Sequence, residues 1–258
     1  MPRKPRQESS TEFYHITSRG INKFPIFSKN LERSRFLNIV HDSISQYNIK
    51  IFAYCVMSNH FHLLMRAPIE ELSAFMARIL SVYAVYYNQK HNRVGYVFDG
   101  RFRSQCIEDE SYFFNCLRYI HLNPVKANMC KSIENYRYSS FKEYASPSSA
   151  GIIHPIAFEI INNHFESLEH FKSFHSVFTD KVFIDLPEDE LLQRKIIATS
   201  LLHNMQQDLD IPAVEILDNI PSRKMFDTII KNFFNISMQQ AENIRKLIQS
   251  ELKQKGQS

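Results

Sequence analysis

Two histidines separated by one large apolar residue, His60-Phe61-His62, constrain the fold of this chain more than any other feature. Apolar residues flank them on both sides, which is typical of a buried strand. Side chains alternate between the two faces of a strand, so His60 and His62 project from one face and Phe61 from the other. Two neighbouring imidazoles can bind a divalent cation if a third ligand comes from another element. The alternative is a pair of half-buried histidines bonded to backbone or water.

The composition excludes several other classes of protein. The chain has 258 residues, 44% hydrophobic and 22% charged, enough for one large domain or two small ones. Its 5 glycines form no Gly-rich phosphate loop, which excludes the common nucleotide-binding motifs. No apolar run is long enough for a membrane span or a signal core, so we expect a cytoplasmic protein without membrane contact. The 4 cysteines lack paired spacing and indicate reduced thiols.

The net charge of +4 is unevenly distributed along the chain. Residues 1–145 hold 20 Lys and Arg against 12 Asp and Glu, a net of +8. Residues 146–222 hold 4 against 12, a net of −8, and residues 223–258 hold 7 against 3, a net of +4. A basic segment that also carries a potential metal site points to a polyanionic partner for the first part of the chain.

The hydrophobic periodicity predicts an α+β fold. Strands are expected at about 12–18, 49–56, 60–66 and 101–107, and helices at 31–47, 70–89 and 109–122. We expect Asn30 to cap the first helix and Pro124 to end the third near Asn123. The order β-α-β-β-α-β-α predicts a ferredoxin-like or RRM-like antiparallel sheet with flanking helices.

The expected domain boundaries follow from composition. Residues 1–10 are predicted to be a basic flexible arm, 11–145 the α+β domain, and 146–187 a linker and an unassigned region. The linker signal, rich in Ser and Pro, covers residues 139–151. Residues 188–258 are predicted to be mainly helical, with helices at 188–208, 212–219, 222–234 and 237–253.

The last two of these helices partly match a helix-turn-helix. Five residues are apolar where that motif is apolar: Ile230, Phe234, Ile236, Ala241 and Ile244. Lys231 stands where the motif usually has a small residue. The alternative is a helical region that only packs.

The third predicted helix carries a second group of chemically useful side chains. Tyr119 and Asn123 are four residues apart and therefore lie on the same helix face, whereas His121 faces elsewhere. If that face meets the histidine pair, Asn123 offers an amide oxygen as a third metal ligand and Tyr119 a phenol beside the metal. The alternative is that both residues only cap and pack the helix end.

Several sequence blocks, in order, resemble one known family. They are Thr17-Ser18-Arg19-Gly20, Met57-Ser58-Asn59-His60-Phe61-His62-Leu63-Leu64, Gly100-Arg101-Phe102-Arg103-Ser104, Tyr119-Ile120-His121-Leu122-Asn123-Pro124-Val125-Lys126-Ala127 and Tyr138-Ser139-Ser140-Phe141. Over roughly residues 11–145 the sequence is similar to REP-associated tyrosine transposases, insertion-sequence-like members of the single-tyrosine branch of the HUH nucleases. The resemblance implies that His60 and His62 bind a divalent metal, that Tyr119 attacks DNA, and that Asn123 is the third ligand. Arg103 stands where the family often has Lys, and the charge is kept.

This chemistry predicts a metal-dependent transposase or strand-transferase that cleaves single-stranded, hairpin-bearing DNA through a phosphotyrosine intermediate. Mg²⁺ or Mn²⁺ would neutralise charge at the scissile phosphate, and a tyrosine ester would preserve the bond energy for rejoining. Five basic residues are candidate DNA contacts: Arg19, Arg101, Arg103, Arg118 and Lys126. The alternatives are an RRM-like module that binds single strands without cutting them, and a hydrolase that uses water and tolerates the loss of Tyr119. The expected partner is DNA with palindromic repeats, bound by a monomer or homodimer at the bacterial nucleoid.

Overall fold

The protein forms two compact units, residues 1–179 and residues 180–258. The structure, a computed structural model, describes residues 6–147, 151–176 and 187–255. None of the helices in these ranges is both long and apolar enough to cross a membrane.

The first unit is built on a four-stranded antiparallel sheet in the order β2-β3-β1-β4. Its strands are β1 (Phe13–Arg19), β2 (Lys50–Val56), β3 (His60–Arg66) and β4 (Arg103–Cys106). Three long helices flank it, α1 (Asn30–Ile44), α2 (Ile69–Lys90) and α3 (Glu110–Lys126), and two 3-10 turns, η1 (Ile21–Lys23) and η2 (Ile133–Asn135), connect elements. Both the element order and the strand order are those of a ferredoxin-like sheet, so the predicted fold class is confirmed.

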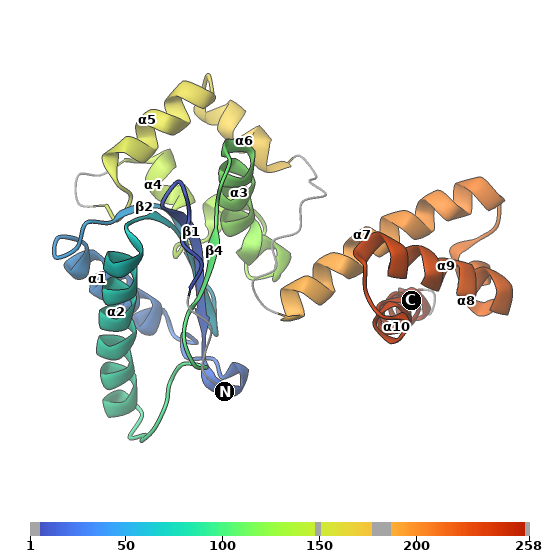
Figure 1. The fold of residues 1–258 in the computed structure, drawn as a ribbon, viewed down its shortest axis with the longest axis horizontal. Helices are drawn as coiled ribbons and strands as arrows, with labels where there is room; N and C mark the ends of the chain where they lie inside the picture. The colour runs from blue at the N-terminus through green and yellow to red at the C-terminus, as the bar shows by residue number, and fades with distance from the viewer. Residues whose placement is uncertain (1–5, 148–150, 177–186, 256–258) are drawn as a thin grey trace. The chain divides into compact units, whose positions relative to one another are not determined.

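The two faces of the sheet are covered by different helices (Figure 1). On one face, the ring of Phe61 in β3 lies 4.5 Å from that of Phe36 in α1, and Tyr83 of α2 joins the same aromatic cluster. On the other face, Phe113 of α3 lies 5.3 Å from Phe13 in β1. Tyr83 is fully buried and its hydroxyl donates to the Ile26 carbonyl, so this tyrosine of α2 belongs to the core.

Two of the predicted helix boundaries are wrong. Helix α3 does not end at Asn123 but continues through Pro124 to Lys126. Proline there removes a single backbone donor close to the helix end, and the Ala127 amide still bonds the Asn123 carbonyl at 3.0 Å. Asn30 is the first residue inside α1 rather than its cap; the cap is Lys29, whose backbone amide donates to the Glu32 carboxylate at 2.8 Å.

The linker predicted at 139–151 is wrong for its first part. Ser139 and Ser140 are fully buried against β2, where the Ser140 hydroxyl accepts from the Tyr54 amide at 2.9 Å. Residues Phe141–Ala145 then form helix α4. Serine favours loops because its hydroxyl bonds nearby backbone, and here that hydroxyl bonds the edge strand of the sheet instead. Residues 148–150 of the predicted linker lie outside the described residues.

The unassigned region contains two further helices of the first unit, α5 (Pro155–His164) and α6 (Leu168–Ser176). Residues 177–186 lie outside the described residues, as do residues 1–5 of the predicted flexible arm. The described end of that arm is attached to the sheet, because the Ser9 amide donates to the Tyr14 hydroxyl at 2.9 Å.

The second unit is helical, as predicted, with α7 (Pro187–Leu209), α8 (Ala213–Asp218), α9 (Ile220–Phe234) and α10 (Met238–Lys255). Its core is a cluster of buried apolar residues drawn from all four helices: Ala198, Leu202, Met205, Ile216, Leu217, Phe226, Ile230, Ala241, Ile244 and Ile248. An ion pair between Arg245 and Asp227, 2.8 Å apart, joins α10 to α9 at the edge of this core.

A buried histidine pair fastens α3 to the later helices of the first unit. His121 of α3 lies 2.9 Å from His175 of α6, measured between Nδ1 and Nε2, and its other nitrogen lies 2.8 Å from the Ser140 hydroxyl. The Nδ1–H of His175 in turn donates to the Phe171 carbonyl. His121 thus contacts α6 and Ser140 rather than the rings that Tyr119 contacts, as its position in the helix predicts. Burial lowers the pKa of His175 to about 4 and that of His121 well below the usual histidine range.

Because the pKa values of His121 and His175 are lowered in the folded protein, we predict that the first unit loses stability in mild acid. Below about pH 6.5 the unfolded chain protonates both histidines and the folded chain does not, so the free energy of unfolding falls as the pH drops toward 4. The expected slope is about 1.4 kcal/mol per pH unit for each histidine. All 12 tyrosines precede residue 145, so tyrosine fluorescence during urea unfolding reports on this unit alone. His175→Gln should flatten the pH dependence, whereas the exposed His170→Gln should leave it intact; equal slopes in the two variants would contradict the assignment.

Gly20 predicts a second, purely steric effect. Its φ of −62° is accessible to any residue, but an added Cβ would lie 2.3 Å from the Phe24 carbonyl oxygen. Gly100 is the opposite case, with φ of +69° and no heavy atom within 4 Å of the same position. Gly100→Ala should therefore cost about 1 kcal/mol of backbone strain, and Gly20→Ala about 2 kcal/mol or more because packed backbone must move. Urea unfolding measures both; a Gly20→Ala protein as stable as the Gly100→Ala protein would refute the steric argument.

Candidate active site

The site lies on the sheet face that α3 covers. The rings of His60 and His62 are 4.8 Å apart between centroids and nearly perpendicular, and both side chains are buried. They are on one face because β3 is regular and its register is determined by β1, in which Thr17 pairs with His62 and Arg19 with His60. The predicted pairing of the two imidazoles is therefore present.

Helix α3 brings Tyr119 to the histidines. The Tyr119 ring lies 5.6 Å from that of His62 and 5.8 Å from that of His15, edge-on to both. Tyr119 is buried, and the ammonium of Lys126, one helix turn beyond Asn123, lies 5.1 Å from the centre of its ring. A nucleophile candidate, a cation and two imidazoles thus meet in one place.

The sequence patterns assign no role to Asn59 or His15, and both lie directly behind the histidine pair. The Asn59 carbonyl oxygen of the side chain lies 2.6 Å from His60 Nδ1, and His15 Nε2 lies 3.2 Å from His62 Nδ1. An amide oxygen only accepts hydrogen bonds, so His60 Nδ1 carries the proton and Nε2 the lone pair. The available signals were the polar residue directly before the histidine pair and a histidine in the first strand.

Asn59 is itself held in place by the end of β1. Its backbone carbonyl accepts from the Gly20 amide at 2.8 Å, and its side-chain nitrogen donates to the Lys23 carbonyl at 3.3 Å. This approach requires the glycine, because a side chain at position 20 would meet Phe24. The Thr17–Gly20 block thus positions the loop that orients His60.

Asn123 is buried one turn beyond Tyr119 on α3. Its side-chain nitrogen donates to the Tyr119 carbonyl at 3.0 Å, which directs the amide oxygen away from that bond. Among the residues that the structure describes, no three side chains of His, Cys, Asp or Glu gather closely enough to hold a metal ion. A metal bound by His60 and His62 therefore needs an amide, a hydroxyl or a DNA oxygen as its next ligand.

The five predicted DNA contacts occupy different environments. Arg103 is exposed on β4 and pairs with Thr17, so it shares a cross-strand row with His62. Arg101 is exposed just before β4, and Arg19 forms an ion pair with Asp99 at 3.1 Å. Arg118 is buried: its guanidinium donates to the Phe174 carbonyl at 3.2 Å and lies over the Phe174 ring. Arg118 therefore ties α3 to α6, whereas Arg103 presents its charge on the face of the site.

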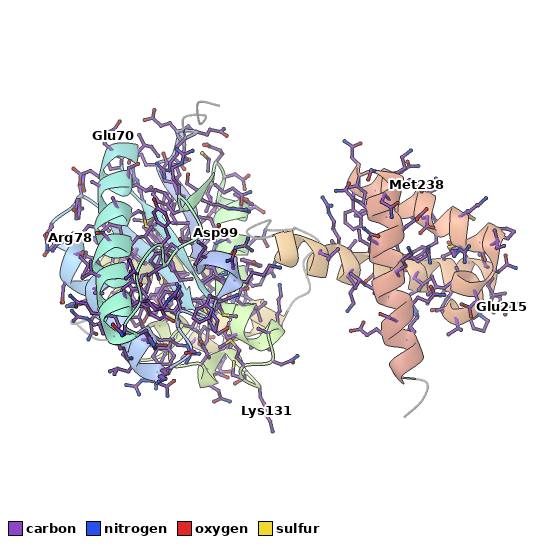
Figure 2. All side chains as sticks on the ribbon, turned by 90° about the horizontal axis from the view of Figure 1, so that it is seen from below. Glu70, Arg78, Asp99, Lys131, Glu215 and Met238 are labelled. Atoms are coloured by element: carbon purple, nitrogen blue, oxygen red, sulfur yellow. The ribbon has the colours of Figure 1, made fainter. Side chains whose placement is uncertain are left out.

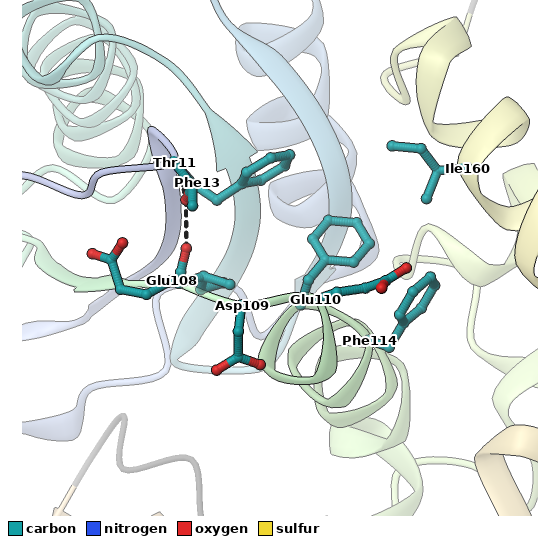
Figure 3. A pocket seen from close by; sticks show the side chains of 9 residues that line it. Thr11, Phe13, Glu108, Asp109, Glu110, Phe114 and Ile160 are labelled. Carbon is teal, nitrogen blue, oxygen red and sulfur yellow. Dashed lines mark hydrogen bonds between the residues drawn. The ribbon is translucent and has the colours of Figure 1, made fainter.

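A separate pocket of about 340 Å³ opens at the other end of α3 (Figure 3). Three carboxylates, Glu108, Asp109 and Glu110, line it beside the rings of Phe13 and Phe114. This concentration of negative charge repels phosphate, so the pocket does not extend the candidate site.

Comparison with known proteins gives concordant matches. Residues 9–123 match the family model described as "Transposase IS200 like". A candidate REP-associated tyrosine transposase of Haemophilus influenzae is 28% identical over 145 residues, covering 49% of this chain and 82% of that protein.

Two solved structures are also similar. One is a REP-associated tyrosine transposase bound to a REP hairpin, with 16% identity, a TM-score of 0.49 and coverage of 60% of this chain and 91% of that one. The other is described as a transposase of Deinococcus radiodurans, with 14% identity, a TM-score of 0.33 and coverage of 43% and 89%. The family match coincides with the segment that carries His60, His62, Tyr119 and Asn123. The resemblance to the tyrosine transposases is therefore confirmed, and residues 9–123 of this chain are similar to the IS200-like transposases.

Proposed function

We propose that this protein is a metal-dependent tyrosine transposase that cleaves and rejoins single-stranded, hairpin-bearing DNA through a covalent phosphotyrosine intermediate. The observation that carries the proposal is the convergence of Tyr119 with His60 and His62 on one sheet face, with a ring separation of 5.6 Å between Tyr119 and His62. A module that only bound single strands would not need a buried tyrosine packed edge-on to the rings of His62 and His15. The hairpin partner is suggested by the solved REP-associated tyrosine transposase, which is described as bound to a REP hairpin.

In the proposed reaction, the Tyr119 oxygen attacks the scissile phosphorus. A bond forms between that oxygen and phosphorus, the bond from phosphorus to the 3′ oxygen breaks, and the strand leaves with a 3′-OH. The proton that the phenol loses passes through water to the leaving 3′ oxygen, and the exposed Lys126 ammonium over the ring stabilises negative charge on the phenolic oxygen during the attack. The reverse attack by another 3′-OH restores the phosphodiester and frees Tyr119.

The donor set fits a divalent cation held by His60 and His62, with Asn123 as the proposed third ligand. The bond from Asn59 to His60 supports this, because protonation of Nδ1 leaves the Nε2 lone pair for a metal. His15 Nε2 is the hydrogen-bond partner of His62 Nδ1, on the side of the ring opposite the proposed metal-binding nitrogen. When bound, the cation would neutralise charge on the scissile phosphate. Nitrogen donors suit Mn²⁺ better than Mg²⁺, which prefers oxygen ligands.

Arg103 is a further proposed phosphate contact on the face of the site. It stands two strands from His62 in the same cross-strand row, roughly 10 Å away at the usual strand spacing. That distance spans one to two nucleotides of an extended strand. Arg103 would therefore hold the phosphate next to the one that reacts.

The decisive experiment removes the nucleophile without changing its shape. Tyr119→Phe should abolish both cleavage and the covalent adduct while keeping the binding of hairpin single strands, because only one hydroxyl is lost. His60→Ala should weaken cleavage and its dependence on Mn²⁺ while Tyr119 remains in place. Labelled single strands that carry the palindrome nearest the gene, incubated with Mn²⁺ and separated on a denaturing gel, reveal both effects. Cleavage by Tyr119→Phe at the normal rate would mean that water is the nucleophile; binding without cleavage by the native protein would favour a binding module.

Lys126 provides a second test with a matched control. Lys126→Gln should lower kcat about tenfold or more with little change in KM, because the ammonium acts on charge that develops during the attack. Lys131 is exposed, lies in the loop after α3 and carries the same charge, so Lys131→Gln controls for the general loss of a cation. Equal kcat values for the two variants would remove Lys126 from the reaction.

A further inference from the structure

The junction of α9 and α10 has the backbone of a helix-turn-helix. Helix α9 ends at Phe234 and is capped by Asn235, which adopts the left-handed conformation with φ of 50° and ψ of 51°. The Ile236 amide then donates to the Lys231 carbonyl at 3.1 Å and closes the end of the helix. Ser237 and Gln240 exchange hydrogen bonds between backbone and side chain, which starts α10 at once. Only three residues therefore separate the two helices.

The apolar positions of the motif lie in the core of the second unit. Ile230, Ala241 and Ile244 are buried in its hydrophobic cluster, and Phe234 and Ile236 pack against the same cluster. Lys231, where the motif usually has a small residue, is exposed, so its long side chain does not separate the helices. The partial helix-turn-helix match in the sequence thus corresponds to two packed helices joined by a short turn.

One face of α10 is polar and open to solvent. Gln239, Asn243 and Lys246 are all exposed, at spacings of four and three residues, so they form a single stripe along the first half of the helix. Figure 2 labels Met238 at the start of this helix, next to the turn. Two residues of the stripe are hydrogen-bonded to each other: the Gln239 side-chain nitrogen donates to the Asn243 side-chain oxygen at 3.4 Å.

These residue types suit duplex DNA. Gln and Asn side chains make paired hydrogen bonds to adenine in the major groove, and Lys bonds to guanine. The charge distribution also favours DNA binding by the last two helices, since residues 223–258 carry a net charge of +4 while residues 146–222 carry a net charge of −8. The positive charge is thus concentrated on the helix pair that would meet the phosphates.

We propose that the second unit is a sequence-reading helix-turn-helix that binds duplex DNA, with α10 in the major groove and Gln239, Asn243 and Lys246 contacting base edges. This activity is separate from strand cleavage by the first unit. It would let the enzyme recognise a second site, in duplex DNA, near the strand that it cleaves.

The test is selection of short duplexes with a randomised centre by the full-length protein, followed by binding measurements on the enriched duplex. The native protein should enrich one sequence. The double variant Gln239→Ala, Asn243→Ala should bind that sequence about tenfold more weakly or worse and lose the preference. Asn204→Ala, Gln207→Ala removes the same two residue types from exposed positions of α7 and should change nothing. Lys246→Gln should also weaken binding and relax the preference at one base pair, because it removes a contact to a base edge.

Further measurements separate this proposal from loss of fold and from strand cleavage. Circular dichroism melts should coincide for all variants, because every substituted side chain is exposed. The α10 variants should still cleave single strands, and Tyr119→Phe should still bind the enriched duplex. The proposal is overturned if the native protein enriches no sequence, or if the α10 double variant binds the enriched duplex as tightly as the α7 control.

Discussion

The two-residue alternation of β3 is the constraint on which both the core and the candidate site depend. Phe61 packs against Phe36 in the aromatic layer, while His60 and His62 project to the opposite face, beneath α3. A shift of one residue in the pairing with β1 would exchange the two sets, exposing the histidines to the aromatic layer. The free energy that holds Phe61 in the core therefore also holds the imidazoles in register.

Helix α3 connects this register to the rest of the unit. One side presents Phe113 and Tyr119 to the sheet, and the other holds His121 and Arg118 against α6. Helix α6 thus supports the element that carries the proposed nucleophile. This bracing explains why the compact unit extends past residue 145, beyond the family match that ends at 123.

Some features could not be predicted because they depend on partners far away in the chain. Ser139 and Ser140 have the composition of a linker, yet Ser139 forms a bridge with Cys55 of β2, and both the amide and the hydroxyl of Ser140 bond the backbone of Tyr54. Pro124 favours a helix end, but the packing of α3 on β2 and β3 outweighs the loss of one hydrogen bond. The position of Asn59 directly before the histidine pair does not reveal its role, because that role depends on the approach of Gly20 and Lys23.

The sequence by itself determined the strand and helix order, the shared face of His60 and His62, and the opposite directions of Tyr119 and His121. Each of these follows from a local period, two residues in a strand and 3.6 in a helix. Only the tertiary structure decided that Tyr119 lies beside His62, that His15 and Asn59 stand behind the histidines, and that Arg118 is buried while Arg103 is exposed. These contacts join residues that are far apart in the chain. They depend on how side chains pack between the sheet and the helices, and no local period in the sequence encodes that packing.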